Sequence, residues 1–86
     1  MKTRKLYNRI GVLRRERGVS RKDLAEAIGV NFQTVGYLER GEYNPSLDLA
    51  FRISEYFNLP VHLVFSTRPM KPMSQELLEQ RKKRGE

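Results

Sequence analysis

The chain has 86 residues, of which 38% are hydrophobic and none is Trp, so it can bury one modest core and is expected to form one small domain. Its formal net charge of +7 suits a polyanionic partner, although RNA-binding and membrane-surface proteins share that property. The absence of cysteine excludes a disulfide framework and a thiolate metal site.

The N-terminal part predicts a first helix and the start of a second. Asn8 can cap the first helix, Ile10 and Leu13 form its inward stripe, and Gly18 is typical of the position after a helix end. Ser20 is the expected cap of the second helix.

Two short helices that cross at a sharp angle are predicted for residues 21–40. Gly29 stands where the chain would turn with positive φ, and Asn31 can cap the second of these helices, expected over residues 32–40. The apolar and small residues that would face the core are Leu24, Ala25, Ile28, Val30, Val35 and Leu38. This helix-turn-helix unit leaves one face of its second helix exposed, and its geometry fits the major groove of DNA.

The rest of the chain predicts two further helices and a basic tail. Residues 41–45 form a loop, Ser46 caps a fourth helix, and Pro60 opens a short fifth helix that ends near Phe65. An all-α fold of five helices around one core is therefore expected. For residues 69–86 four interpretations stay open: disorder, a short helix, an arm on flanking DNA, and a segment that docks a protein.

Positive charge is concentrated at both ends of the sequence. Residues 1–22 hold nine Lys and Arg against one Glu, residues 23–65 hold two against six acids, and residues 66–86 hold six against three. Phosphates would therefore be bound by the first helix, the start of the second helix and the tail. The helix at 32–40 would supply mostly uncharged groups.

Three segments resemble the Cro/C-repressor, or Xre-type, helix-turn-helix family. They are LRRERGVSRKDLAEAIGV, the TVxxLERG pattern that ends at Gly41, and the NPS that opens the fourth helix, and together the resemblance covers about residues 8–65. It implies a compact, lambda-repressor-like domain of five helices that binds DNA as a two-fold dimer. On this basis residues 1–68 are the predicted DNA-binding domain.

The resemblance implies that bases are contacted from the first two turns of the helix at 32–40, by Gln33, Tyr37, Phe32 and Gly36. Gln33 is the strongest candidate because its carboxamide can pair with adenine N6 and N7. Tyr37 can offer its ring to a thymine methyl or its hydroxyl to a phosphate or base edge. The alternative for Gln33 and Tyr37 is that each is an ordinary exposed helix position without a contact to DNA. Phe32 can touch a thymine methyl or fold back over the core. Gly36 either lets the backbone approach DNA closely or touches nothing.

Phosphate contacts are expected at several elements. Arg21 lies at the N-terminus of the second helix, where many relatives have Gln, so a cation and the helix dipole would act on the same phosphate. Weaker candidates, which can equally be solvated, are Arg9, Arg15, Lys22, Thr34 and Arg40. The loop at Tyr43 and Asn44 can offer hydroxyl, amide and backbone donors to a neighbouring phosphate.

Arg14 and Glu39 are charged residues in segments that otherwise belong to the core. The resemblance implies that they form an ion pair between the first helix and the end of the third. Arg suits this pair because its planar fork can engage a carboxylate with two hydrogen bonds.

A dimer interface is predicted at the fifth helix, which is apolar nearly all round and needs cover. The residues assigned to it are Leu63, Val61, Phe65, Ser66 and Thr67. The alternative is that the tail folds over Leu63. Residues 3–7 and 64–68 can also pair as two short strands, as in a subgroup of small relatives.

The expected function is that of a DNA-binding transcriptional regulator, most simply a repressor, acting as a homodimer on an inverted-repeat operator. The alternative is an antitoxin or adaptor that uses the same fold mainly to hold a protein partner, for example through the tail. No enzyme, cofactor or metal site is expected, because His62 is the single histidine and no nucleophile or phosphate-loop pattern accompanies it. No secretion signal or membrane span is apparent, which favours the cytoplasm.

Overall fold

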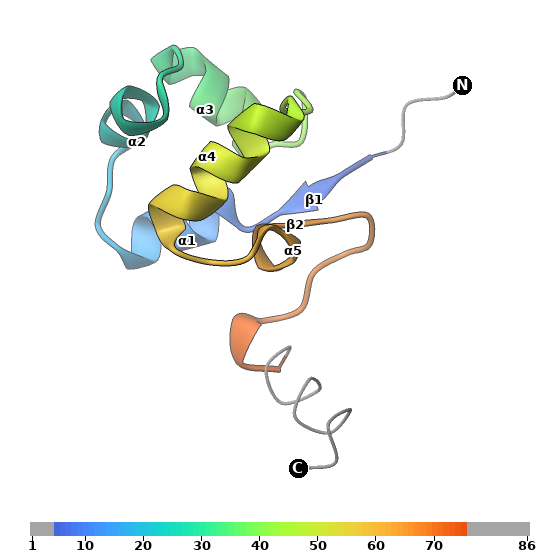
Figure 1. Cartoon of the computed structure of the whole chain (residues 1–86). Coiled ribbons are helices and arrows are strands. Elements are labelled where there is room, and N and C mark those ends of the chain that lie inside the picture. The colour runs from blue at the N-terminus through green and yellow to red at the C-terminus, as the bar shows by residue number, and fades with distance from the viewer. Residues whose placement is uncertain (1–4, 76–86) are drawn as a thin grey trace.

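The computed structural model describes residues 5–75, which form five helices and a two-stranded sheet (Figure 1). In chain order these are β1 (Tyr7–Asn8), α1 (Ile10–Glu16), α2 (Arg21–Ile28), α3 (Phe32–Glu39), α4 (Leu47–Phe57), α5 (Val61–Val64) and β2 (Phe65–Ser66). A further helical turn begins at Met73. The predictions for residues 1–4 and 76–86, including the basic run at 81–84, lie outside the described residues.

Local capping signals place the helix starts. Ser20 Oγ accepts a hydrogen bond of 3.0 Å from the backbone N–H of Asp23, and Ser46 Oγ accepts one of 3.1 Å from Leu49. Asn31 Oδ1 accepts one of 2.9 Å from the N–H two residues on. These three predicted caps are confirmed.

Two helix starts differ by a residue or two from their predictions. Asn8 Oδ1 does accept a hydrogen bond of 3.0 Å from the N–H of Ile10, but α1 begins only at Ile10, because Asn8 still belongs to β1. Pro60 precedes α5 instead of being its first residue: its ψ of 148° is extended, so helical geometry begins at Val61.

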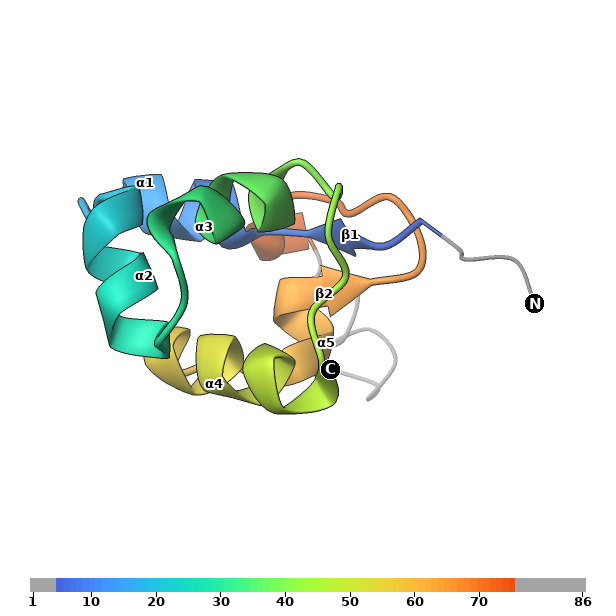
Figure 2. The same cartoon turned by 90° about the horizontal axis from the view of Figure 1, so that it is seen from above.

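The core is formed where α4 packs across α2 and reaches α5. Figure 2 shows α4 on one side of the domain, α1 and α3 on the other, α2 at one end and the sheet at the opposite end. Ala25 is 3% exposed, and its small side chain lets the helices of the helix-turn-helix unit approach each other. The largest fully buried side chains are Phe57, Ile10, Leu24, Leu38, Ile53, Val35 and Val64.

The sheet joins the two ends of the domain. Tyr7 lies opposite Ser66 and Asn8 opposite Phe65 in an antiparallel pair, and the N–H of Arg9 continues the ladder with a hydrogen bond of 2.9 Å to the carbonyl of Val64. The predicted pairing is confirmed in a shorter form that lies closer to α1. Residues 7–9 are thereby fixed beside the end of α5.

Arg9 corrects one prediction. Its side chain is only 5% exposed, and its guanidinium donates hydrogen bonds of 2.6 Å to the carbonyl of Leu63 and 2.5 Å to the carbonyl of Lys71. Arg9 therefore links Lys71 to α5. The sequence makes Arg9 a candidate phosphate ligand, but its buried guanidinium is not available for that contact.

Leu63 corrects a second prediction. The side chain is 6% exposed within a single chain, so it has almost no apolar area left to offer a second copy. The helix is short, and residues 70–74, which follow it in the chain, line a separate groove with Val12 and Leu13 of α1. Leu63 and Val64 of α5 are thus already buried within their own chain.

Candidate nucleic-acid interface

One face of α3 is buried and the other is open to solvent. Val35 and Leu38 are at most 2% exposed, whereas Phe32 is 55% and Tyr37 47% exposed, and Gln33 is exposed as well. Because the exposed side chains carry no charge, they can discriminate base edges without binding every phosphate alike. Of the two interpretations of Phe32, the structure favours the outward-facing one.

Gly36 lies beneath the side chain of Arg40. A Cβ atom at position 36 would be 3.1 Å from Arg40 Nη1, and the guanidinium carbon lies 5.3 Å from the centre of the Tyr37 ring. A shallow hollow of about 180 Å³ on this face is lined by Arg21, Phe32, Gln33, Gly36, Tyr37 and Arg40. The glycine therefore makes room for a side chain of the same helix end, an interpretation that the sequence did not suggest.

Arg40 is oriented by Glu42. Its Nε donates hydrogen bonds of 3.0 and 2.9 Å to the two carboxylate oxygens, and both side chains are half exposed. The hydrogen bond to Glu42 raises the pKa of Arg40. Sequence reasoning missed Glu42; its opposite charge two residues after Arg40 is the signal that points to it.

The other candidate phosphate ligands surround α3. Arg21, at the first position of α2, has a side chain that is 42% exposed. Lys22 is exposed beside it, and in the loop after α3 both Asn44 and Tyr43 are exposed, the latter by 47%. Thr34 is half-buried on α3.

Glu39 links α1, α2 and α3. Its Oε2 accepts a hydrogen bond of 2.7 Å from Arg14 Nε, and its Oε1 accepts hydrogen bonds of 3.3 and 3.2 Å from Arg21 Nε and Nη2. The side chains of Glu39 and Arg14 are 7% and 13% exposed, so the structure contains the ion pair that the resemblance implied and adds Arg21 to it. Burial alone would raise the pKa of Glu39, but the hydrogen bonds and charges of the two arginines together lower it below its ordinary value of 4.5.

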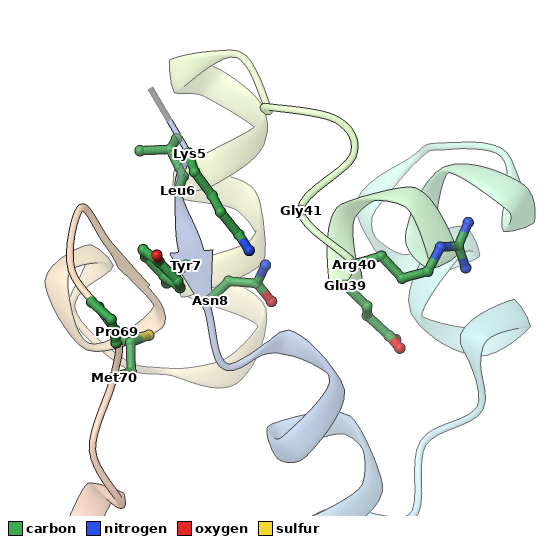
Figure 3. Close-up of a pocket in the computed structure, with 9 residues that line it drawn as sticks. All are labelled: Lys5, Leu6, Tyr7, Asn8, Glu39, Arg40, Gly41, Pro69 and Met70. Atoms are coloured by element: carbon green, nitrogen blue, oxygen red, sulfur yellow. The ribbon is translucent and has the colours of Figure 1, made fainter. Parts of the chain in front are cut away.

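A cleft of about 400 Å³ separates β1 from the end of α3 (Figure 3). Asn8 spans its floor by donating a hydrogen bond of 2.8 Å from Nδ2 to the carbonyl of Leu38. Lys5 lines the strand side of this cleft, a position that its place in the basic N-terminal segment hinted at but that sequence reasoning did not name. Glu39 and Arg40 diverge at the other side: in Figure 3 the Arg40 side chain points away from β1.

Other chemistries find little support within residues 5–75. No group of three or more His, Cys, Asp or Glu side chains is placed to hold a metal ion there. His62 is exposed on α5. None of the helices in this part of the chain has the length and apolar character that crossing a bilayer requires.

Comparisons with known proteins match this geometry. The family model described as Helix-turn-helix matches residues 10–64. An HTH-type transcriptional regulator of Archaeoglobus fulgidus is 40% identical over 60 residues, covering 70% of this chain and 86% of the relative. The HTH-type transcriptional regulator YgzD of Bacillus subtilis is 41% identical over 60 residues, covering 70% of this chain and 91% of the relative. The crystal structure of a transcriptional regulator from Listeria innocua is similar with a TM-score of 0.61 and 29% identity, covering 84% of this chain and 71% of that one.

Proposed function

The chain belongs to the Cro/C-repressor type of helix-turn-helix family, and from that membership we propose that it is a sequence-specific regulator of transcription that binds double-stranded DNA. The family consists of DNA-binding regulators, so the chain is not an enzyme. This role would place it in the cytoplasm, with the DNA.

The observation that carries the proposal is the uncharged, exposed face of α3 with cations at its border. In the proposed complex α3 lies in the major groove, where Gln33 pairs with an adenine and Tyr37 contacts a thymine methyl or a base edge. Phe32 is exposed enough to join them.

Phosphate contacts would hold α3 in this register. Arg21 and Lys22 lie at the start of α2, and the loop after α3 offers Tyr43 and Asn44. Thr34 is a further candidate. Contacts of this kind fix the position of the domain on the duplex and carry no sequence information themselves.

We also propose that the domain, residues 1–68, acts as a repressor and binds as a two-fold dimer. Apart from Leu63, the residues assigned to the interface retain exposed area: Val61, Phe65 and Ser66 are half-buried and Thr67 is exposed. A symmetric dimer requires an inverted repeat with half-sites roughly 34 Å apart.

Selection of binding sites from random double-stranded DNA tests the proposal. We expect an inverted repeat, a slope of log K against log salt of roughly −5 to −7 for five to eight phosphate contacts, and loss of one base preference in Gln33→Ala. Gln75→Ala, which removes the same exposed amide outside the helix-turn-helix unit, is the matched control and should bind like the parent chain. A selection that enriches no sequence contradicts the proposal and favours the antitoxin or adaptor alternative.

A further inference from the structure

The side chain of Arg40 extends back along α3, toward the N-terminus of that helix. Arg40 is the residue after α3, yet its guanidinium lies against Gly36 and over the ring of Tyr37, one turn back along the helix. This location brings the charged side chain into the shallow hollow that Gln33 also lines. Arg21, at the start of α2, lines the same hollow, but its guanidinium donates hydrogen bonds to Glu39.

We propose that Arg40 is a specificity-determining residue that recognises a guanine next to the bases contacted by Gln33 and Tyr37. This proposal rests on the proposed function, and it specifies one base of the DNA site that the domain would bind. A guanidinium edge presents two parallel N–H donors, and guanine presents O6 and N7 as a matching pair of acceptors in the major groove.

Three neighbours hold this guanidinium in place. Gly36 provides the seat, by which we mean the space against the helix backbone that the guanidinium occupies, because a Cβ atom there would come within 3.1 Å of Arg40 Nη1. The ring of Tyr37 supports the guanidinium from one side, with 5.3 Å between its centre and the guanidinium carbon. Glu42 is a positioning residue on the remaining side.

The hydrogen bonds of Glu42 use the Nε of Arg40 and no other nitrogen. Within residues 5–75, the structure shows no hydrogen bond from Arg40 Nη1 or Nη2, so the edge formed by these two nitrogens is available to a ligand. Glu42 thus fixes the plane of the guanidinium without occupying the donors that a guanine would accept from.

The first experiment compares site selection by the parent chain, Arg40→Ala and Arg40→Lys. We expect the parent chain to select a guanine at one position of each half-site, and both variants to lose that preference, because lysine keeps the charge and lacks the fork. Replacing this guanine by 7-deazaguanine, which lacks N7, should weaken the parent chain about tenfold and leave Arg40→Ala unaffected. Lys22→Ala serves as the control for a phosphate contact: it should weaken binding to all sequences and reduce the salt slope by about two, because each protomer of the proposed dimer loses one contact.

The second experiment tests the seat. Gly36→Ala should weaken the same guanine preference in the parent chain, because the guanidinium of Arg40 must shift by a few tenths of an ångström, and it should have no further effect in Arg40→Ala. Glu42→Gln should reduce the preference severalfold, which a purely structural role of Glu42 would not do. Circular dichroism of each variant checks that the helices are retained, and alanine at position 36 favours the helix.

The outcomes separate the two proposals. A parent chain that selects no sequence overturns the proposed function and this inference together. A parent chain that selects a site, while Arg40→Ala shows the uniform weakening of Lys22→Ala and keeps every base preference, overturns this inference alone. An equal effect of Gly36→Ala with and without Arg40 overturns the assignment of Gly36 as the seat.

Discussion

Replacing Glu39 by alanine should destabilise the domain strongly, since this carboxylate joins three helices. The change removes the partner of Arg14, whose side chain is 13% exposed, and the weaker hydrogen bonds from Arg21, which is 42% exposed. Arg14 keeps one acceptor, the carbonyl of Val19 at 3.1 Å, and Arg21 can turn to water.

These contacts set the size of the effect. Removing one partner of a buried ion pair costs roughly 3–5 kcal/mol, and the acceptor that Arg14 retains places Glu39→Ala at the lower end, at about 3 kcal/mol. In a domain of this size each kcal/mol lowers the melting temperature by about 4–8 °C, so a decrease of about 12–24 °C is expected. The loss is a large fraction of a total stability that is about 0.05–0.15 kcal/mol per residue.

Urea unfolding followed by circular dichroism measures the loss directly, and it suits a chain that lacks Trp. Arg21→Gln is the control: it removes the exposed partner at 3.2 Å and leaves the Arg14 pair intact, so it should cost less than about 1 kcal/mol. If Glu39→Ala and Arg21→Gln cost the same small amount, the ion pair does not hold the three helices together.

The pH dependence provides a second test of the same carboxylate. Its pKa in the folded protein is lowered from 4.5, so its contribution is present at neutral pH and is lost as the pH falls below that value and through the folded pKa. The difference in unfolding free energy between the parent chain and Glu39→Gln should therefore be largest near neutral pH and shrink below pH 4.5. A difference that grows on acidification would contradict the assigned direction.

Three further predictions concern stability. Asn31→Ala removes the cap of α3 and should cost about 1 kcal/mol in urea unfolding, without changing the guanine preference. Gly29→Ala forces a Cβ onto a residue with φ of 74° and should cost about 1–2 kcal/mol, visible as a lower melting temperature. Arg9→Ala removes the hydrogen bonds to the carbonyls of Leu63 and Lys71 and should cost about 2 kcal/mol; an unchanged urea midpoint would show that these bonds do not stabilise the fold.

The parts of the fold that were predictable depend on interactions within one helical turn. Ser20, Asn31 and Ser46 cap the N–H groups two or three residues ahead, and Gly29 adopts its left-handed conformation for reasons that lie in its own backbone. Such signals act locally and do not depend on how the helices pack. The predicted helix ends therefore agree with the observed ones to within about two residues.

The errors concern burial, which depends on parts of the chain that are distant in sequence. Arg9 has the residue type of an exposed cation, but the carbonyl that it binds at Lys71 is 62 positions away. Leu63 was expected to need a second copy because its helix is apolar, whereas the same chain already covers it. Neither arrangement leaves a local pattern in the sequence.

On the exposed face of α3, too, the sequence did not predict which side chains are in contact. The resemblance gave Gln33 and Tyr37 as candidates from their positions in the family pattern. That pattern says nothing about where a long, flexible side chain at the helix end will lie, so the contact between Arg40 and Gly36 became visible only in the structure.

In the proposed complex Arg21 would leave Glu39 for a phosphate, and the geometry indicates that this exchange removes only the weaker of the two ion pairs of Glu39. Its hydrogen bonds to Glu39 are 3.2 and 3.3 Å long, against 2.7 Å for the bond from Arg14. A phosphate that draws Arg21 away therefore leaves Glu39 with its shorter and more buried partner. An arginine at this position can thus move toward DNA while Glu39 still joins α1 to α3 through Arg14, which a domain with Arg21 as the sole partner of Glu39 could not do.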